Sequence, residues 1–340
     1  MKILFDIGHP AQLNFFKNSI KKLSEKYFIY ITYVNRGQLS KIIIEELGLI
    51  SNCNLISNGY HRGTIFSVVF DLNIIRPTLL FLRSVLIKPD IVISSGYQAG
   101  IYPKVARIPS IQFSDDLEKG RLFIGLMKFF NKEIYFPFYS NDKIKPFNAL
   151  KEWAYLSPKY FIPNKKELFN LGLNEKEYIF VREVSTNTMN YRKQNDYLIE
   201  SIINKFPEDI CVVLSLENKN RINAFPKNWI ILNEPVQDIH SILYFAKIVI
   251  SSGDSMAREG ALLGVPSIYS GIRKMFANKV LIDEGMLFHK DVLDVPDFID
   301  RIMNDHVEIE EQNKFRKRLK NDWIDITEFV ISKIEGYIRD

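Results

Sequence analysis

The stretch from residue 247 to residue 270 constrains the fold more than any other part of this sequence. It opens with β-branched residues at 248–250, which predict a strand buried on both faces. Small polar residues interrupt this run, helical spacing follows over residues 256–263, and a Gly-Val-Pro sequence at 264–266 ends the helix. A second apolar run comes next, at 267–269. Strand, polar loop, helix and strand in this order predict a βαβ unit.

The polar loop of this unit precedes a helix at the carboxyl end of a strand. Unpaired backbone N–H groups and the positive end of the helix dipole converge there, so the loop favours an anion. The candidate binding residues are Ser252, Gly253, Asp254, Ser255 and Met256.

Glu259 lies four residues after Ser255, on the same helix face and one turn below the loop. A phosphate on the loop would repel a carboxylate beside it, so Glu259 is expected to meet a different group. A sugar diol fits, because a carboxylate accepts two hydrogen bonds from vicinal hydroxyls. Spacing alone leaves a second interpretation open, in which Glu259 is a solvated residue on an ordinary helix.

Both halves of the chain alternate strands with helices, which predicts two doubly wound parallel sheets. The elements expected in the first half are 3–7, 13–27, 28–34, 39–47, 91–94 and 110–113. Those expected in the second half are 178–181, 196–205, 211–216, 230–232, 239–245 and 274–284. Residues 137–163 are rich in Pro, Asn, Asp and Lys and predict the crossover. The expected domains are therefore 1–150 and 151–307, followed by a C-terminal segment, 308–340, with one charged helix over 308–338.

Three loops of the first half follow predicted strands, so they should line one common cleft. His9 follows the first strand, and its ordinary pKa near neutrality makes it a candidate base. A turn histidine bonded to backbone is the alternative. Asp115 and Asp116 follow the strand 110–113, and one of them could be the base instead or orient His9. The other would be a helix N-cap. The loop after 91–94 offers Ser95, Gly96 and Gln98.

Arg182 ends the first predicted strand of the second half. A guanidinium group pairs with phosphate in a bidentate fork, so Arg182 is a candidate ligand for a diphosphate. A salt bridge to Glu183 or Glu217 is the alternative. Arg258 adjoins Glu259 but points off the helix in another direction, so we expect it to be structural.

The aromatic-rich run 122–139 also allows two interpretations. We expect it to lie in the core. If its apolar face is exposed instead, then with Lys128 and Lys132 beside it the run would touch a membrane or a lipid-linked acceptor.

Composition limits the class of protein. The chain has 340 residues, of which 46% are hydrophobic and 25% charged, as expected for two globular domains. Its net charge of +5 fits an anionic ligand or a phospholipid surface and is too diffuse to indicate nucleic acid.

Two unpatterned cysteines and a strand at the very start predict a cytoplasmic protein without a signal peptide. The apolar stretch 65–87 contains charged residues and a proline that argue against a membrane span. Because no metal-ligand spacing occurs, we expect no metal.

The run SSGDSMAREGALLGVPSI resembles the nucleotide-sugar site of GT-B glycosyltransferases and of UDP-N-acetylglucosamine 2-epimerases. In those proteins a Gly-rich loop holds the diphosphate and a helix Glu takes the ribose. The chain as a whole is similar to a family of GT-B-like proteins, the domain-of-unknown-function 354 family. The likeness rests on the opening MKILFDIGHPAQLNFFKN, on KEWAYLSP followed by YIFVRE, and on MAREGALLGVP. It extends over most of the 340 residues.

This resemblance implies a GT-B-like α/β fold, with two Rossmann-like domains facing across a cleft and the last helix crossing back over the first domain. It implies transfer of a sugar from a nucleotide-sugar donor, UDP-linked, to a glycan or lipid-linked acceptor in surface polysaccharide synthesis. The second domain would bind the donor, His9 or Asp115 would activate the acceptor, and no metal or further cofactor would be needed. Gln12 and Asn14 stand where related proteins often carry histidines that could act as bases, and they are acceptor-side candidates here.

Two other functions stay open. An epimerase acting on a UDP-N-acetylhexosamine needs several carboxylates and a histidine around the sugar, some of which His9, Asp115, Asp116 and Glu118 could supply. A non-catalytic nucleotide-sugar-binding protein would need none of them. Peripheral contact with the inner face of the membrane and the oligomeric state are likewise left open.

Overall fold

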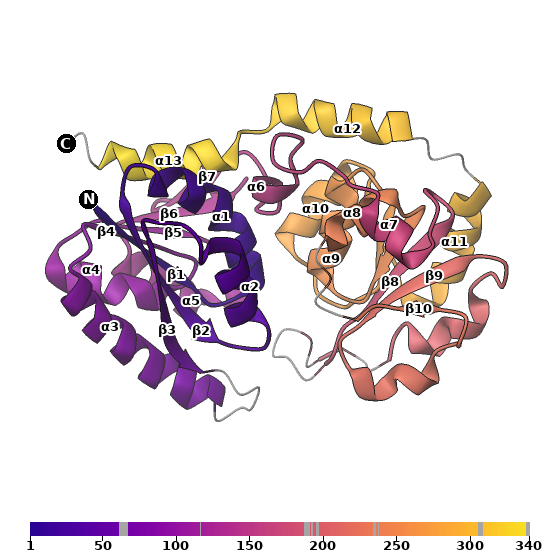
Figure 1. Ribbon diagram of the computed structural model, residues 1–340, viewed down its shortest axis with the longest axis horizontal. Coiled ribbons are helices and arrows are strands. Elements are labelled where there is room, and N and C mark those ends of the chain that lie inside the picture. The colour runs from indigo at the N-terminus through magenta and orange to yellow at the C-terminus, as the bar shows by residue number, and fades with distance from the viewer. Residues whose placement is uncertain are drawn as a thin grey trace. The chain divides into compact units, whose positions relative to one another are not determined.

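The computed structural model divides the chain into two compact units (Figure 1). Unit 1 comprises Met1–Tyr155 and Trp323–Asp340, and unit 2 comprises Leu156–Asp322. The structure describes residues 1–60, 67–115, 117–186, 191, 193–194, 197–233, 236, 238–304 and 309–337.

Unit 1 contains a seven-stranded sheet with the order β3-β2-β1-β4-β5-β6-β7, in which every pair of neighbours is parallel. The strands are β1 (Lys2–Ile7), β2 (Phe28–Asn35), β3 (Cys53–Tyr60), β4 (Ile91–Ser94), β5 (Ser110–Phe113), β6 (Glu133–Pro137) and β7 (Ile144–Phe147). The first three strands build outward in one direction, and the chain then returns to the other side of β1. The sheet is therefore doubly wound, as the alternation of strands and helices predicted.

The helices of unit 1 cover its sheet (Figure 1). They are α1 (Pro10–Ser24), α2 (Leu39–Leu47), α3 (Arg76–Ile87), α4 (Ile101–Ala106), α5 (Arg121–Phe130) and α13 (Ile326–Gly336), with the π-helix η1 (Ser67–Ile75) and the 3-10 turns η2 (Tyr97–Gly100) and η3 (Leu117–Lys119). The short α6 (Trp153–Leu156) lies at the boundary of the two units.

The C-terminal helix α13 is part of the core of unit 1. Its Phe329 contacts the rings of Phe113, Tyr135 and Phe147 at centroid distances of 5.2–6.4 Å. The phenyl groups of Phe15 and Phe16 on α1 join the same aromatic cluster. Residues more than 200 positions apart in the sequence therefore complete one core.

The prediction of a single helix over 308–338 is wrong, because two helices occupy this part of the chain. Helix α12 (Ile309–Asp322) belongs to unit 2, and α13 belongs to unit 1. Between them the Ile324 N–H donates to the Asn148 carbonyl, and Trp323 packs against Trp153. Asp325 then caps α13 by accepting a hydrogen bond from the Glu328 N–H. A capping residue and a buried indole thus interrupt the charged helical pattern.

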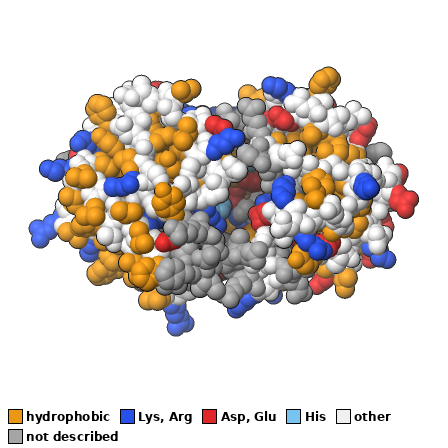
Figure 2. All heavy atoms as spheres, turned by 60° about the horizontal axis from the view of Figure 1, so that its bottom comes forward, with side chains coloured by type: hydrophobic (Ala, Val, Ile, Leu, Met, Phe, Trp, Pro, Cys, Tyr) orange, Lys and Arg blue, Asp and Glu red, His pale blue; other side chains and the backbone are white. Residues whose placement is uncertain are grey.

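The aromatic run 122–139 is core only in part. Tyr135 and Phe136 on β6 are buried, as expected. On α5, Met127 is fully buried in a core cluster, but Leu122 is 80% exposed and Phe129 60% exposed, so the expectation of a core is wrong for the outer face of this helix. Figure 2 shows hydrophobic side chains together with Lys and Arg side chains on the face of unit 1 that this view presents.

Unit 2 contains a six-stranded parallel sheet with the order β10-β9-β8-β11-β12-β13. The strands are β8 (Tyr178–Glu183), β9 (Cys211–Leu216), β10 (Ile230–Ile231), β11 (Ile248–Ser251), β12 (Ser267–Tyr269) and β13 (Leu287–His289). The helices are α7 (Lys166–Leu171), α8 (Ile239–Phe245), α9 (Asp254–Leu262), α10 (Phe276–Asp283), α11 (Val295–Asn304) and α12, with the 3-10 helices η4 (Glu200–Lys205), η5 (Lys219–Ala224) and η6 (Val292–Asp294).

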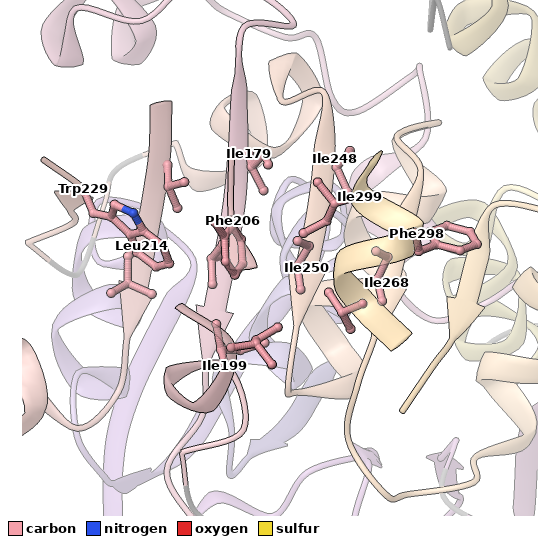
Figure 3. Packing of buried hydrophobic residues seen from close by; sticks show 14 of the residues in the cluster. Ile179, Ile199, Phe206, Leu214, Trp229, Ile248, Ile250, Ile268, Phe298 and Ile299 are labelled. Carbon is pink, nitrogen blue, oxygen red and sulfur yellow. The ribbon is translucent and has the colours of Figure 1, made fainter. Parts of the chain in front are cut away.

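One face of this sheet packs on α11 (Figure 3). Ile250 of β11 and Ile268 of β12 lie beside Ile299 of α11, and all three side chains are fully buried. The β-branched run that predicted a buried strand therefore forms the middle of a core, as its composition indicates.

Among the described residues, no helix is both long and apolar enough to cross a membrane. The predicted helix 196–205 is replaced over 200–205 by the 3-10 helix η4, and Asp196 lies outside the described residues. Strands β3, β6, β7 and β13 were not predicted, and β7 falls inside the stretch 137–163 where the crossover was expected.

Candidate functional site

Each sheet changes its direction of growth at one point, and the loops with the predicted site residues lie beside these points. In unit 2, β8 has β9 on one side and β11 on the other, and Arg182 is in register with Ser251. Ligands of doubly wound sheets bind beyond the carboxyl ends of the strands at such switch points. The loops after β8 and β11, which hold the predicted donor-binding residues, are therefore brought together as expected.

The first turn of α9 presents its backbone N–H groups at this edge. Its N-cap residue, Gly253, has no side chain to bond them, and its own N–H donates to the Ser251 hydroxyl group at 3.0 Å. The first N–H groups of a helix have no partner within the helix. Ser255 is exposed and Met256 half-buried, so solvent reaches this turn. The arrangement suits an anionic group.

Only glycine fits at position 253. A Cβ atom there would lie 2.5 Å from Cγ1 of Val184, which follows β8. The absence of a side chain lets the loops after β8 and β11 pack directly on each other, and this contact fixes the position of the α9 N-terminus.

The Asp254 carboxylate does not point into solvent but is 2% exposed. Arg258 and Arg273 each donate to its Oδ2 atom at 3.2 Å, and the Tyr191 hydroxyl group donates to Oδ1. Burial alone would raise the pKa of the Asp254 carboxyl group, but the charges of Arg258 and Arg273 hold this pKa below its ordinary value. Asp254 is thus an internal anchor of the first turn, whose one negative charge is shared by two guanidinium groups.

Arg258 is structural, as predicted, because it is 2% exposed and also donates to Oδ1 of Asn278 at 2.9 Å. Arg273, by contrast, was missed. Its side chain is 18% exposed, and it follows β12 after a Ser-Gly turn. A basic residue just beyond a predicted strand and a glycine was the sequence signal that could have identified it.

Ser252 is fully buried and joins the two loops. Its hydroxyl group donates to Oε1 of Glu183 at 2.8 Å and accepts from the Val184 N–H at 2.9 Å. Burial raises the pKa of the Glu183 carboxyl group, although this group accepts hydrogen bonds from Ser252 and from the Ile199 and Glu200 N–H groups. Ser252 therefore holds the loops after β8 and β11 together, and a direct contact with a ligand would come from the other candidate binding residues.

Arg182 is paired within the protein, which is the alternative that the sequence left open. Its Nη2 atom lies 2.6 Å from Oε1 of Glu217, and its Nη1 atom donates to the Ser215 hydroxyl group. The other Glu217 oxygen accepts from the Ser185 N–H at 2.8 Å. Its role as a diphosphate ligand stays a prediction.

Glu259 faces helix α8. Its Oε1 atom lies 3.5 Å from Nε2 of His240, and its side chain is 12% exposed. It is therefore not a freely solvated residue, which argues against the alternative interpretation of its spacing. His240 was not singled out from the sequence, because a lone histidine near a helix start carries no pattern.

In unit 1, His9 lies at the start of α1, after the end of β1. Its side chain is exposed, and its Nδ1 atom accepts a hydrogen bond from the Ala11 N–H at 3.1 Å. His9 is thus the N-cap of α1, the alternative that the sequence left open. Because Nδ1 accepts, the neutral imidazole carries its proton on Nε2, which can donate a hydrogen bond to a ligand.

Asp115 is half-buried and forms an ion pair of 2.9 Å with Lys151. The Asp115 carboxylate is thus held in place by an ion pair within unit 1. Asp116 lies outside the described residues.

The acceptor-side candidates lie at the carboxyl edge of the unit 1 sheet. Gln12 accepts from the Gly8 N–H at 2.6 Å, and Asn14 is half-buried on α1. Ser95 is 8% exposed and, like Gly96 and Gln98, follows β4, the strand beside β1. These residues share one edge of one sheet, and their contact with a ligand stays a prediction.

Within the described ranges, no group of three or more His, Cys, Asp and Glu side chains has the arrangement of a metal site. The expectation that no metal is required stays a prediction, because this geometry does not test the reaction.

The fold is similar to those of solved nucleotide-sugar enzymes. The UDP-N-acetylglucosamine 2-epimerase from Rickettsia bellii matches with a TM-score of 0.71 and 12% identity, over 100% of this chain and 97% of that one. The glycosyltransferase VinC in complex with dTDP matches with a TM-score of 0.68 and 11% identity, over 100% of both chains. The UDP-GlcNAc 2-epimerase from Methanocaldococcus jannaschii in complex with UDP-GlcNAc and UDP matches with a TM-score of 0.64 and 13% identity, over 94% of this chain and 100% of that one.

At these identities the matches show the fold, which is GT-B-like with two Rossmann-like domains, as predicted. A comparison with curated protein sequences finds no match. The model of the family described as protein of unknown function DUF354 matches residues 138–339. That is more than half of the sequence and includes two of the three motifs on which the resemblance rested, so this chain belongs to the DUF354 family.

Proposed function

We propose that this protein is a glycosyltransferase that moves a sugar from a nucleotide-sugar donor, UDP-linked, to a glycan or lipid-linked acceptor in surface polysaccharide synthesis. The observation that carries the proposal is the first turn of α9 at the switch point of unit 2. Its N-cap residue has no side chain, and buried Asp254, paired with Arg258 and Arg273, holds the turn in place. A nucleoside diphosphate is the anion that this fold most often holds at such a place.

The charges around the turn support a diphosphate ligand. Asp254, Arg258 and Arg273 together carry one negative and two positive charges, which sum to +1. Arg273 is the partly exposed member, so it is the side chain that can turn toward a phosphate oxygen without breaking the buried pair of Asp254 and Arg258. The backbone N–H groups of Ser255 and Met256 would bind the same group.

Glu259 lies one turn further along α9, beside His240. We assign its carboxylate to the ribose hydroxyl groups of the donor, with His240 orienting it. The solved relatives support such a ligand, since VinC is bound to dTDP and the M. jannaschii epimerase to UDP-GlcNAc and UDP.

In this proposal, unit 1 supplies the group that activates the acceptor. Asp115 and His9 are the candidates, of which Asp115 pairs with Lys151 and His9 accepts from the Ala11 N–H. We assign the base to His9, in the tautomer that carries its proton on Nδ1 and so keeps the Nε2 lone pair for the proton of the acceptor hydroxyl group; this tautomer gives up the hydrogen bond from the Ala11 N–H. No metal is required in this scheme, since the helix N-terminus and Arg273 would balance the charge of the leaving diphosphate.

A thermal-shift screen with UDP, dTDP, GDP and CMP tests the donor site. A ligand at 100 times its dissociation constant stabilises the folded protein by about 2.7 kcal/mol, which is readily measured. We expect a shift with UDP that Glu259→Ala abolishes. If no nucleotide stabilises the wild type, the donor site is wrong.

Mass spectrometry of the stabilising UDP-sugar then separates the three functions. A transferase consumes the donor only when an acceptor is present, and an epimerase converts the donor alone. A protein that binds UDP-sugars but turns over neither substrate combination would be a binding protein. Only the first result supports the proposal.

A further inference from the structure

Unit 1 has a pocket of about 600 Å³ far from the edge that carries His9 and Asp115. It is lined by the residues that lead into β5 and β6, by the C-terminal part of α4 and by the end of α5. These positions lie at the amino-terminal edge of the sheet, whereas His9 and Asp115 follow β1 and β5 at the carboxyl edge. The pocket is therefore a separate site.

The lining of this pocket is strongly basic. Six cationic side chains contribute to it, with Asp142 as the one acidic residue: Lys104, Arg107, Lys128, Lys132, Lys143 and Lys145. Of these, Lys145 forms an ion pair with Glu133, and the other five have no carboxylate within 4 Å among the described residues. Like charges without a carboxylate partner repel one another, and an anion in the pocket would relieve this repulsion.

The walls of the pocket are firmly packed. A Cβ atom at Gly100 would lie 2.7 Å from the Phe130 carbonyl oxygen, so the start of α4 and the end of α5 touch through a glycine. The Lys132 N–H donates to the Ser110 hydroxyl group at 3.1 Å, which joins the starts of β5 and β6. The cations therefore extend from a rigid frame.

Apolar side chains are exposed on α4 and α5, which line the pocket, and on the neighbouring helix α3. On α3, Leu82, Val85 and Leu86 are 53%, 42% and 81% exposed, and Val105 on α4 is 67% exposed. Leu122 and Phe129 on α5 are 80% and 60% exposed. Helix α4 contacts both α3 and α5, so these six side chains belong to neighbouring helices. Phe129 also lines the basic pocket, where Lys104 lies 5.1 Å from its ring centre.

We propose that the faces of α3, α4 and α5, together with the basic pocket, dock on an anionic lipid bilayer, with a phosphate headgroup in the pocket. The exposed apolar side chains would contact the acyl chains of such a bilayer, and the basic side chains of the pocket would contact its anionic headgroups. A second copy of this chain fits less well, because a symmetric contact would bring two cation clusters together. This docking is independent of the donor site, and its test requires no activity.

The test is flotation of the full-length protein with vesicles of phosphatidylcholine alone or mixed with phosphatidylglycerol. We expect binding to the mixed vesicles only, and less of it at high salt. Near an anionic surface each basic residue contributes about a fivefold factor in affinity, so Lys104→Gln/Arg107→Gln/Lys128→Gln should bind about 100-fold more weakly. Lys205→Gln/Lys227→Gln, two exposed lysines of unit 2, is the matched control and should bind like the wild type.

A second variant tests the apolar part. Leu86→Ser/Leu122→Ser/Phe129→Ser should weaken binding at least tenfold even at low salt, whereas Ile162→Ser/Phe169→Ser, which changes exposed apolar residues of unit 2, should leave it unchanged. Circular dichroism confirms that each variant is folded.

Several outcomes would overturn the proposal. They are no binding to either vesicle, equal binding to both, or equal losses in the matched controls. Glycerol 3-phosphate serves as a probe of the pocket by calorimetry. If it binds and the basic variant loses it, while vesicles do not bind, the pocket holds a free phosphate ester instead. Tighter binding to an oligonucleotide than to mixed vesicles, unaffected by the serine variant, would make the surface a nucleic-acid site.

Discussion

Both units bury an aspartate–arginine pair beside the switch point of their sheets, but the two pairs differ in position and in charge. In unit 1, Asp6 lies on β1, and both of its oxygens accept from Nη2 of Arg76, at 2.8 and 2.7 Å. In unit 2, Asp254 lies at the start of α9 and is shared by Arg258 and Arg273. The first pair is balanced one to one, whereas the second combines one carboxylate with two guanidinium groups.

The difference in charge favours an anion at the carboxyl edge of the unit 2 sheet over the same edge in unit 1. The balanced pair of unit 1 stabilises the end of a strand and offers no excess charge. The unbalanced set of unit 2 fixes the first turn of a helix and keeps one arginine partly exposed beside it. Two domains that are both doubly wound thus carry different electrostatics beside their switch points, in keeping with a donor site in unit 2.

Asp254→Asn should be the most destabilising change in this comparison. It removes the carboxylate that the Arg258 and Arg273 guanidinium groups share, and breaking a buried pair costs about 3–5 kcal/mol of unfolding free energy. Asp6→Asn leaves one uncompensated guanidinium group and should cost less. Urea unfolding of both variants measures the difference. An equal or larger loss in Asp6→Asn would contradict the comparison.

The contribution of Asp254 should also depend on pH. Its pKa is lower in the folded protein than the ordinary value of 3.8, so the unfolded chain binds more protons between these two values. The stability that Asp254 provides is therefore present above about pH 4 and is lost as the pH falls through 3.8 toward the folded pKa. Urea unfolding at a series of acidic pH values should show the gap between wild type and Asp254→Asn closing. A gap that stays constant would show that the charge is not responsible.

Gly253→Ala should destabilise unit 2 by about 1–3 kcal/mol, because the new methyl group would overlap Val184. UDP binding should weaken with it, since the α9 N-terminus would shift. Gly125→Ala is a suitable control. Nothing lies within 4 Å of a Cβ atom at this position of α5, and alanine favours a helix, so stability should rise slightly. Thermal unfolding measures the stability of both variants, and the melting temperature should fall for Gly253→Ala and rise slightly for Gly125→Ala.

Arg273→Gln should lower the affinity for UDP by about tenfold or more, because it removes a charge-assisted hydrogen bond to phosphate. Arg318→Gln, which loses an exposed arginine paired with Glu284, should bind UDP like the wild type. Isothermal titration calorimetry of the two variants measures the contrast. Equal affinities would remove Arg273 from the donor site.

His9→Ala should cost about 1 kcal/mol of stability, since α1 loses its N-cap. Transfer activity should fall far more than this loss explains, while affinity for UDP stays unchanged. Asp238→Ala, which removes the N-cap of α8 in unit 2, provides a comparison for the structural part. A His9→Ala enzyme with full activity would show that this histidine is a cap only.

Local patterns predicted the fold where sequence and packing agree. The helices 39–47 and 239–245 and the strand 211–216 have the predicted bounds, because each is a clear apolar pattern with end signals. Helix α1 begins at Pro10, earlier than the predicted 13, because His9 caps it and proline is tolerated in the first turn. Strand β3 was missed, since its two asparagines and a glycine disfavour a strand and only pairing with β2 forms it.

The sequence predicted where in the chain the candidate site lies, but not which side chains pair with each other there. Sequence located the loop, the glycine and Glu259, because strand, loop and helix leave a periodic trace. It did not reveal that Asp254 and Ser252 are turned inward, that Arg182 pairs with Glu217, or that Arg273 completes the set. These are contacts between residues 19 to 69 positions apart, and one sequence contains no signal for them.

Calorimetric titration of UDP into wild type, Glu259→Ala and His9→Ala tests the central claim most directly. The account predicts that wild type and His9→Ala bind UDP equally, whereas Glu259→Ala binds at least tenfold more weakly. No binding to the wild type, or a loss confined to His9→Ala, would contradict a donor site at the first turns of α9.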